Sequence, residues 1–358
     1  MTECSTQATP DSHWRRLLRG VCLGMLLPIA MPVALCHAAP PPTSETTATP
    51  VPVVDKGTLL KLLQSETGLS AEELRPALDS ARFDPSVITR METPYEAKPY
   101  AQYRPLFVYD RLAQLGRHYL DEHRAIFQEA WKRYGVEPEI IASILAIETH
   151  FGEQQGSDRV LDSLYTLASG YPRRADFFRK ELGEYLKLCH AENLDPDSII
   201  GSYAGAFGVP QFIPSSYMAY AVDGNGDGHR DVWHSPRDII FSVANYFHQH
   251  GWQPRLPVAR WLSQEPATKP LLDQRGKEMQ DWQPLQKLYA EGLQRLPASW
   301  RQSDPVALIT MQPGDHDRTA VVSRNFYVIT RWNRSYNYAM ATTELAHLMG
   351  CGHCGTGL

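Results

Sequence analysis

One glutamate in this sequence stands where a side chain could exchange a proton with a substrate. Glu148 follows a predominantly apolar run, residues 140–147, and precedes Thr149-His150-Phe151-Gly152, which is typical of a helix end. A carboxyl group at this place is partly shielded from water, and shielding disfavours its ionised form. Glu148 could therefore hold a proton near neutral pH and donate it as a general acid. The alternative is a helix-terminal carboxylate that turns to water or pairs with an arginine.

A second stretch has the ligand spacing of a calcium loop. Residues 223–231 place oxygen-bearing side chains at loop positions one, three, five and nine and a glycine at position six, as an EF-hand requires. Position twelve is His234 instead of the usual glutamate, so we expect Asp238 to close the site, although it could instead complete a capping box with Ser235. Runs of Asp, Asn and Gly also form plain turns. The predicted ligands of a structural Ca²⁺ are Asp223, Asn225, Asp227, His229, Asp231 and Asp238.

Helices are expected to position both features. Pro138 at a first turn begins the helix that carries Glu148. Residues 214–221 precede the loop as a helix, and Ser235-Pro236 begins the helix that follows it. An amphipathic pattern predicts one longer helix from Asp110 to Tyr134. Further helices are expected after the capping box Ser70 to Glu73, from Pro172 to about Glu192, and from Tyr336 to Met349.

The pattern changes between Trp261 and Arg334. Residues 306–311 and 325–330 are rich in β-branched and aromatic side chains and are predicted to be strands. With 43% hydrophobic residues, the 358-residue chain can form a substantial core of two or three subdomains. The sequence therefore predicts a mainly α fold of the α+β class.

The first 39 residues have the composition of an export signal. Arg15, Arg16 and Arg19 precede an uncharged stretch, residues 21–35, that is too short and too broken by prolines to favour a membrane-spanning helix. A lipid anchor at Cys36 is the less favoured alternative, because the preceding residue is bulky. Removing residues 1–39 changes the net charge from −5 to −6, since they contain three arginines and two acids. A mildly acidic protein argues against a nucleic-acid partner.

Three cysteines follow the export signal. In an oxidising compartment Cys351 and Cys354 are expected to form a small disulfide, which leaves Cys189 as a buried thiol. A flexible tail is the other interpretation that we keep. A metal or redox pair is the third, and neither a second cysteine pair nor a βαβ pattern supports it.

Several segments occur in the order and spacing of one known family, and the likeness covers roughly residues 83–349. The chain resembles the membrane-bound lytic murein transglycosylase B family. The segments that carry the resemblance are Ile147-Glu148-Thr149 with Gly152, Leu161 to Leu164, Tyr171 to Arg174, Gly201 to Gly208, Gln211 to Tyr217, Lys98 to Arg104, Ser242 to Phe247 and Asn325 to Ile329.

This resemblance implies a lysozyme-like helical catalytic core with an EF-hand-like loop, an extra helical region and a small α/β insertion. It also implies a periplasmic location. The expected organisation is an export signal at 1–39, a Pro/Thr-rich linker at 40–55, a helical region at 56–135, the catalytic core at 136–256, the small α/β region at 257–334, and a C-terminal helix with a cysteine-containing tail at 335–358.

The resemblance also implies a reaction. Such enzymes cleave the β-1,4 bond between N-acetylmuramic acid and N-acetylglucosamine in peptidoglycan, and the muramyl C6 hydroxyl attacks C1 to leave a 1,6-anhydro end. Glu148 would act first as acid and then as base. Two-carboxylate hydrolases need a second acid, and none follows Glu148 at helical spacing.

The family pattern assigns neutral polar and aromatic residues to the sugar. At one further position the family commonly has tyrosine and this chain has Trp332, which keeps an aromatic platform but removes a hydroxyl. The residues implied to contact substrate are Tyr103, Ser202, Gln211, Tyr246, Trp332 and Asn333. Without the resemblance, Ser202 would be interpreted as a turn cap, Gln211 as a surface amide and Tyr246 as a core ring.

Two other functions remain open. A hydrolytic muramidase would need a water-activating group, for which Asp162 is a candidate. A calcium-stabilised peptidoglycan-binding protein without catalysis is the non-enzyme alternative. We expect glycan strands and other cell-wall enzymes as partners, no organic cofactor, and a monomer.

Overall fold

The computed structural model describes residues 53–92, 98–263 and 282–355. The predicted export signal, Cys36 and most of the predicted linker lie outside the described residues. Residues from Pro50 onward form one compact unit, and the description below concerns that unit. Across these three ranges, no helix has both the length and the apolar character needed to cross a membrane.

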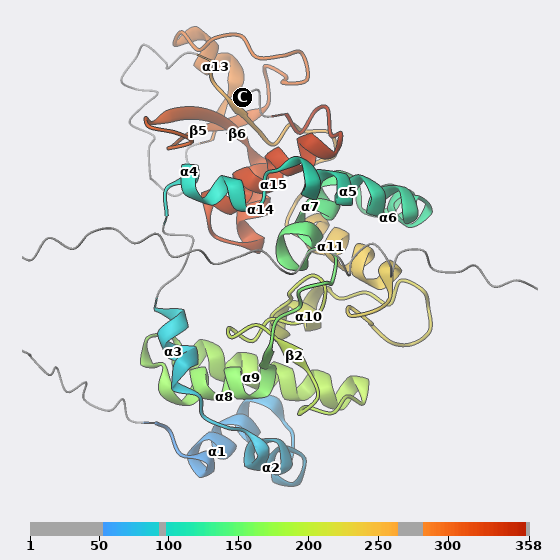
Figure 1. Cartoon of the computed structure of the whole chain (residues 1–358), viewed down its shortest axis with the longest axis vertical. Helices are drawn as coiled ribbons and strands as arrows, with labels where there is room; N and C mark the ends of the chain where they lie inside the picture. Colours follow the sequence, from blue (N-terminus) through green and yellow to red (C-terminus); the bar gives the residue numbers. More distant parts are fainter. Residues whose placement is uncertain (1–52, 93–97, 264–281, 356–358) are drawn as a thin grey trace, which may run out of the picture. The chain divides into compact units, whose positions relative to one another are not determined.

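Helices dominate the described chain, as predicted (Figure 1). In the first half they are α1 (Lys56–Thr67), α2 (Ala71–Ser80), α3 (Pro85–Met91), α4 (Tyr100–Tyr103), η3 (Arg104–Leu106), α5 (Asp110–Glu122), α6 (Arg124–Tyr134), α7 (Pro138–Thr149), α8 (Val160–Gly170), η4 (Pro172–Arg174) and α9 (Ala175–Glu192). In the second half they are α10 (Pro214–Tyr220), α11 (Pro236–Gln249), α13 (Leu285–Ala290), α14 (Arg324–Trp332) and α15 (Tyr336–Met349).

Helix α7 lies at the centre of one group of helices. Its residues from Ile140 to Ile147 are all buried, and a helix that is apolar on every side must be surrounded by other elements. Helices α5, α6, α11 and α15 contact it (Figure 1). The helix begins at Pro138, as predicted, and ends where His150 adopts a left-handed conformation with φ 49°.

A second group of helices combines α1 to α3, which precede α7 in the sequence, with α8 and α9, which follow it. Helices α8 and α9 pack together, α1 packs on α2 and α9, and α3 packs on α8. Helix α2 begins with the predicted capping box: Ser70 accepts from the Glu73 backbone N–H, and the Glu73 carboxylate accepts from that of Ser70. The short antiparallel strands β1 (Asp158–Arg159) and β2 (Ile200–Gly201) join α8 to the segment that follows α9.

The small α/β region contains a four-stranded antiparallel sheet in the order β3-β6-β5-β4. Its strands are β3 (Ala259–Trp261), β4 (Gln283–Pro284), β5 (Pro305–Met311) and β6 (Arg318–Ser323). Strand β5 confirms the predicted strand at 306–311, and it pairs with β6 from Val306 opposite Ser323 to Met311 opposite Arg318. Alternate residues of β5 enter different cores: Val306 and Leu308 pack in a small cluster with α13, whereas Ala307 and Ile309 join the main core.

The predicted strand at 325–330 is wrong, because this segment lies in helix α14. Ser323 caps the helix by accepting from the Asn325 backbone N–H at 3.1 Å. The Asn325 side chain is fully buried and donates to the backbone oxygens of Gln253 and Leu256. A local cap and tertiary hydrogen bonds therefore override the strand preference of β-branched residues.

The prediction of a single helix from Asp110 to Tyr134 is also wrong in one respect. The chain forms two helices there, α5 and α6, which are separated at His123. His123 ends α5 and precedes α6 with φ −106° and ψ 24°. Aromatic side chains pack together at this break. Tyr119 contacts His123 and Phe127 edge to face, and it stacks on Phe151 with ring centroids 4.6 Å apart. Aromatic packing beside the end of α7 thus accompanies the loss of a continuous helix.

The cysteine predictions are confirmed. Cys351 and Cys354 form a disulfide directly after α15, and Cys189 is a buried free thiol. Burial raises the pKa of Cys189 to about 12.

Candidate active site

Glu148 lies in the last turn of α7, half-buried, and one of its oxygens receives two hydrogen bonds. The indole Nε1 of Trp332 donates to Oε1 at 2.9 Å, and the hydroxyl of Tyr338 donates to the same oxygen at 2.6 Å. Tyr338 was not among the residues predicted from the sequence. It lies 190 residues from Glu148 along the chain, so no local pattern could have linked the two.

Packing of α15 on α7, and of α14 on α15, brings the two donors to the glutamate. Trp332 ends α14 and Tyr338 lies in the first turn of α15. Asn333, in the turn between them, accepts from the Ser335 backbone N–H at 3.1 Å, and Ser335 in turn caps α15 by accepting from that of Tyr338. The predicted residue Asn333 therefore shapes the turn that sets the spacing of the two donors.

Aromatic rings enclose this pair of hydrogen bonds. Trp332 stacks on Phe247 with centroids 5.6 Å apart and planes 1° apart, and Tyr246 meets it edge to face at 4.7 Å. Burial raises the pKa of Tyr338 well above its usual range, and the charge of Glu148 and the nearby Tyr103 and Tyr246 add to the effect. Tyr338 thus remains a neutral donor, and the predicted residues Tyr103 and Tyr246 belong to its surroundings.

The predicted residues Ser202 and Gln211 lie in the segment that faces the end of α7. The Ser202 hydroxyl accepts from the Ala206 backbone N–H at 3.1 Å, so it closes a turn. The Gln211 side chain donates to the backbone oxygens of Gln155 and Gly208 at 3.2 and 3.0 Å. Both side chains therefore have structural partners in addition to any role toward substrate.

Strained backbone occurs on both sides of this site. Among the described residues with positive φ other than glycine, His150 (49°) and Phe151 (60°) directly follow α7, and Gln211 (52°) lies in the facing segment. Thr149 ties the two together, because its hydroxyl donates to the Val209 backbone oxygen at 2.8 Å. Such conformations persist only where surrounding contacts hold them, and they concentrate at functional sites.

Asp162, the residue that a hydrolytic mechanism would need, is held by other groups. Its carboxylate accepts from the Arg159 guanidinium at 2.5 and 2.9 Å and from the Arg82 backbone N–H at 2.7 Å. These contacts are those of a structural ion pair at the start of α8.

The loop at 223–234 is closed by hydrogen bonds from backbone N–H groups to side-chain carboxylates. The Asp223 carboxylate accepts from the N–H groups of Gly226, Asp227 and Gly228 at 2.6 to 3.2 Å. Asp231 accepts from those of Trp233 and His234 at 2.9 Å. The predicted ligand side chains therefore already shape the loop.

Asp238, which the sequence predicts to close the site, contacts this loop through backbone N–H groups. It is fully buried, and it accepts from the backbone N–H groups of Gly224 and Asp231 at 2.9 Å and of Asn225 at 3.3 Å. Ser235 also caps the helix by accepting from the Asp238 backbone N–H, but the Ser235 backbone N–H donates to the Asp231 backbone oxygen and not to Asp238, so the capping box considered for this pair is not complete.

The donors of the loop fit calcium in chemical type, because they are hard oxygen atoms on a glycine-containing turn. Gly228, the glycine at position six, has the positive φ, 93°, that such a turn needs. In the part of the chain that the structure describes, however, three carboxylates of the loop do not converge within 4.8 Å of one another. Asp227 instead bonds to Asn225 and to the His229 backbone. Binding would require these exposed side chains to turn inward.

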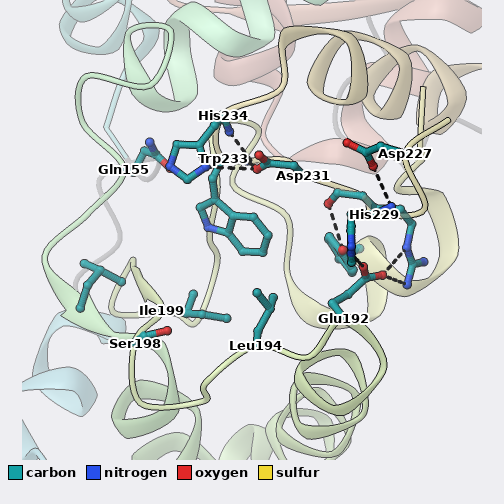
Figure 2. Close-up of a pocket in the computed structure, with 13 residues that line it drawn as sticks. Gln155, Glu192, Leu194, Ser198, Ile199, Asp227, His229, Asp231, Trp233 and His234 are labelled. Carbon is teal, nitrogen blue, oxygen red and sulfur yellow. Dashed lines mark hydrogen bonds and ion pairs between the residues drawn. The ribbon is translucent and has the colours of Figure 1, made fainter. Parts of the chain in front are cut away.

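A cavity of about 650 Å³ lies between the loop and the segment after α9 (Figure 2). Glu192 and His229 line one end, and Gln155 and His234 line the other. Glu192 also binds Arg230 at 2.6 Å, which ties the loop to the end of α9. The cavity is lined by the loop, by the segment after α9 and by Gln155, and by none of the residues predicted for acid catalysis or sugar binding.

Comparison with known proteins assigns the chain to a family. The family model of the transglycosylase SLT domain matches residues 58–347. The membrane-bound lytic murein transglycosylase B of Escherichia coli is 33% identical over 352 residues, which span 89% of this chain and 95% of that protein.

Solved structures agree. The soluble lytic transglycosylase SltB1 of Pseudomonas aeruginosa superposes with a TM-score of 0.75 at 38% identity, over 84% of this chain and 99% of that one. The E. coli lytic transglycosylase Slt35, solved in complex with calcium, superposes with a TM-score of 0.72 at 33% identity, over 84% of this chain and 94% of that one. P. aeruginosa SltB3, solved with NAG-NAM-pentapeptide, superposes with a TM-score of 0.73 at 28% identity, over 83% of this chain and 79% of that one. The chain therefore belongs to the lytic murein transglycosylase B family, and it is a peptidoglycan lytic transglycosylase.

Proposed function

We propose that Glu148 cleaves the β-1,4 bond between N-acetylmuramic acid and N-acetylglucosamine by acting first as acid and then as base. The observation that carries this proposal is the pair of donors on Oε1 from Trp332 and Tyr338. Both lone pairs of Oε1 receive a donated hydrogen, so the acidic proton sits on Oε2. Oε2 delivers that proton to the glycosidic oxygen as the bond to C1 breaks.

The second half of the reaction uses the same carboxylate. After proton transfer Glu148 is negatively charged, and hydrogen bonds to charged acceptors are roughly twice as strong as neutral ones. Trp332 and Tyr338 therefore stabilise the carboxylate as it forms, at no cost in reorganisation. Glu148 then takes the proton of the muramyl C6 hydroxyl while this oxygen attacks C1, and the product is a 1,6-anhydromuramyl end.

The surrounding residues hold the sugar. The partly exposed residues Trp332, Asn333, Ser202 and Gln211 would contact it directly. Tyr246 and Tyr103 are buried and would act through Trp332 and Tyr338. The solved complex of the relative SltB3 with NAG-NAM-pentapeptide supports peptidoglycan as the ligand. We place the enzyme in the periplasm, where this substrate lies, because the named relative is a membrane-bound murein enzyme.

Digestion of purified sacculi tests the chemistry. We expect mass spectrometry to find anhydromuramyl ends with the parent protein and no turnover with Glu148→Gln. Glu153→Gln is the matched control, because Glu153 is exposed and lies beyond the helix end. Reducing muramic acid ends, or full activity of Glu148→Gln, would contradict the proposal.

We also propose that the 223–234 loop binds one structural Ca²⁺ through Asp223, Asn225, Asp227, Asp231 and the backbone carbonyl of His229. Asp238 would hold the loop closed from beneath. The calcium complex of Slt35 supports the identity of the ion. Because oxygen-bound calcium of this kind generates no nucleophile, its role is to stabilise the two helices that flank the loop.

A further inference from the structure

The cavity of about 650 Å³ between the loop and the segment after α9 has no role in the reaction proposed for Glu148 (Figure 2). Its volume lies in the range of about 300–1,000 Å³ that is typical of pockets for small ligands. Such pockets have mainly apolar walls and a few polar groups that orient the ligand. The side chains that line this cavity are divided in the same way, which makes it a candidate binding site.

Apolar side chains meet in the middle of the cavity. Figure 2 shows the indole of Trp233 facing the side chains of Leu194 and Ile199. The indole is held in place, because it stacks on the buried ring of Phe207 with centroids 5.5 Å apart and planes 13° apart. Trp233 and Leu194 are half-buried, so part of each side chain remains open to a ligand. A rigid apolar surface of this kind binds with little loss of conformational entropy.

Hydrogen-bonding groups lie at the two ends. The Gln155 amide is at one end, and at the other end Glu192 accepts from the Arg230 guanidinium Nε at 2.7 Å. An amide and an ion pair both offer donors and acceptors, as a peptide backbone does at almost every residue. A peptide with aliphatic side chains therefore fits both parts of the cavity. A sugar would place hydroxyl groups without partners against Leu194 and Ile199, which is costly.

The cavity begins where the residues predicted to hold the sugar end. Gln211 Nε2 donates to the backbone oxygen of Gln155 at 3.2 Å, and Gln155 lines the cavity. Ile200, which also lines it, is two residues from Ser202, a separation of at most about 7 Å between Cα atoms. Five residues of extended peptide span about 17 Å. A peptide attached to a sugar beside Ser202 and Gln211 is thus long enough to enter the cavity.

We propose that this cavity binds the stem peptide that the muramyl sugar of the substrate carries. Trp233, Leu194 and Ile199 contact its aliphatic side chains, and Gln155 hydrogen-bonds to its backbone. The inference rests on the proposed function, because the sugar bound beside Glu148 delivers the peptide to the cavity. The cavity then sets specificity: strands with peptide bind more tightly than bare strands, and the chemistry at C1 is the same for both.

Two substrates that differ only in the peptide test this inference. Soluble glycan strands are released from sacculi, and one half is stripped of peptide by an amidase that cleaves the bond between the lactyl group and the first alanine. Both are assayed at saturating Ca²⁺, which keeps the 223–234 loop in one state. We expect the parent protein to cleave both, with a KM roughly tenfold lower for strands with peptide, since one apolar contact changes binding by about tenfold or more.

A bulky side chain at the rim should block the cavity. Ser198→Trp makes this change, and Ser65→Trp on α1 is the matched control. Both serines are exposed, and each hydroxyl donates to the backbone oxygen three residues earlier, at 2.8 Å for Ser198 and 2.7 Å for Ser65. We expect Ser198→Trp to raise KM roughly tenfold for strands with peptide and to leave kcat unchanged, because the peptide contributes binding and not chemistry. Neither variant should alter the kinetics on bare strands.

Leu194→Ala is a second, smaller change, which keeps the test decisive if the tryptophan impairs folding. It should raise KM for strands with peptide alone. The inference is overturned if the parent has the same KM for both substrates, if KM changes equally for both, or if folded Ser198→Trp and Leu194→Ala keep the parent KM. Reducing ends in place of anhydromuramyl ends, with the expected KM pattern, would contradict the proposed chemistry and still support the peptide site.

Discussion

The two ends of helix α7 each carry a glutamate, and the two side chains have opposite surroundings. Glu137 precedes the helix, is 2% exposed, and accepts hydrogen bonds from Trp252, Arg255 and His353 on both its oxygens. Glu148 lies in the last turn, is half-buried, and receives both donors, Trp332 and Tyr338, on one oxygen.

The difference has a physical origin in the helix itself. The N-terminal end of a helix stabilises negative charge, and the C-terminal end disfavours it. A buried carboxylate that is bonded on both oxygens at the favourable end is fixed in place and serves structure. At the unfavourable end, two donors on Oε1 orient the Glu148 carboxyl group, and we propose that this group exchanges a proton with the substrate. The same residue type therefore has a structural role at one end and, we propose, a catalytic role at the other.

The strongest test of this comparison changes each glutamate separately. We expect Glu148→Gln to lower kcat by roughly 10²–10⁴-fold, the usual contribution of a general acid, and to change the free energy of unfolding by less than about 1 kcal/mol. The amide oxygen can still accept from both donors, so packing is kept. Turnover assays and urea unfolding followed by tryptophan fluorescence measure the two effects.

Glu137→Ala should give the reverse result. It leaves the Trp252 and Arg255 N–H groups buried without an acceptor, and we expect a loss of about 3 kcal/mol in unfolding free energy, since each such group costs about 1–3 kcal/mol. The kcat of the folded fraction should change little. A large loss of kcat in folded protein would show that the two ends of α7 are not independent.

The donors on Oε1 provide a sharper test of the catalytic end. Tyr338→Phe and Trp332→Phe should each lower kcat roughly tenfold or more, because a hydrogen bond to a charged group contributes about 1.5–3 kcal/mol. Trp332→Tyr is the matched variant, since it restores a donor on an aromatic ring. If Trp332→Phe retained full kcat, the indole would serve packing alone.

Calcium should affect stability more than turnover. At a Ca²⁺ concentration 100 times its Kd, we expect about 2.7 kcal/mol of added stability, which chelation should remove, and Asp223→Asn should lower this gain. Asp315→Asn, an exposed aspartate outside the loop, is the control. A gain that Asp223→Asn leaves intact would place the ion elsewhere.

The smallest effect is expected at Cys189, a buried titratable group for which we propose no function. Burial raises its pKa to about 12, so its thiolate fraction at pH 8 is only ~10⁻⁴. Alkylation in the native protein should be very slow and should become faster as pH rises. Mass spectrometry of the peptide that carries Cys189 measures the rate, and rapid labelling at pH 8 would mean that α9 opens readily.

Local signals in the sequence predicted much of this molecule. Pro138 and the apolar run before Glu148 predicted α7, and Ser70 with Glu73 predicted a cap. They failed where a tertiary contact competes with a local preference: Asn325 is held by Gln253 and Leu256, and the segment expected to be a strand is a helix. His123 breaks a helix whose apolar pattern continues across it.

The sequence alone determined that Glu148 ends an apolar helix, that oxygen-bearing residues are spaced as in a calcium loop, and that Cys351 and Cys354 can form a disulfide. Each is a property of residues close together in the chain, where helix and turn geometry convert spacing into position. Only the tertiary structure decided which groups meet these residues. Trp332 and Tyr338 reach Glu148 from 184 and 190 residues away, and His353 reaches Glu137 from 216, because α15 packs along α7 and spacing in the chain carries no information about that contact.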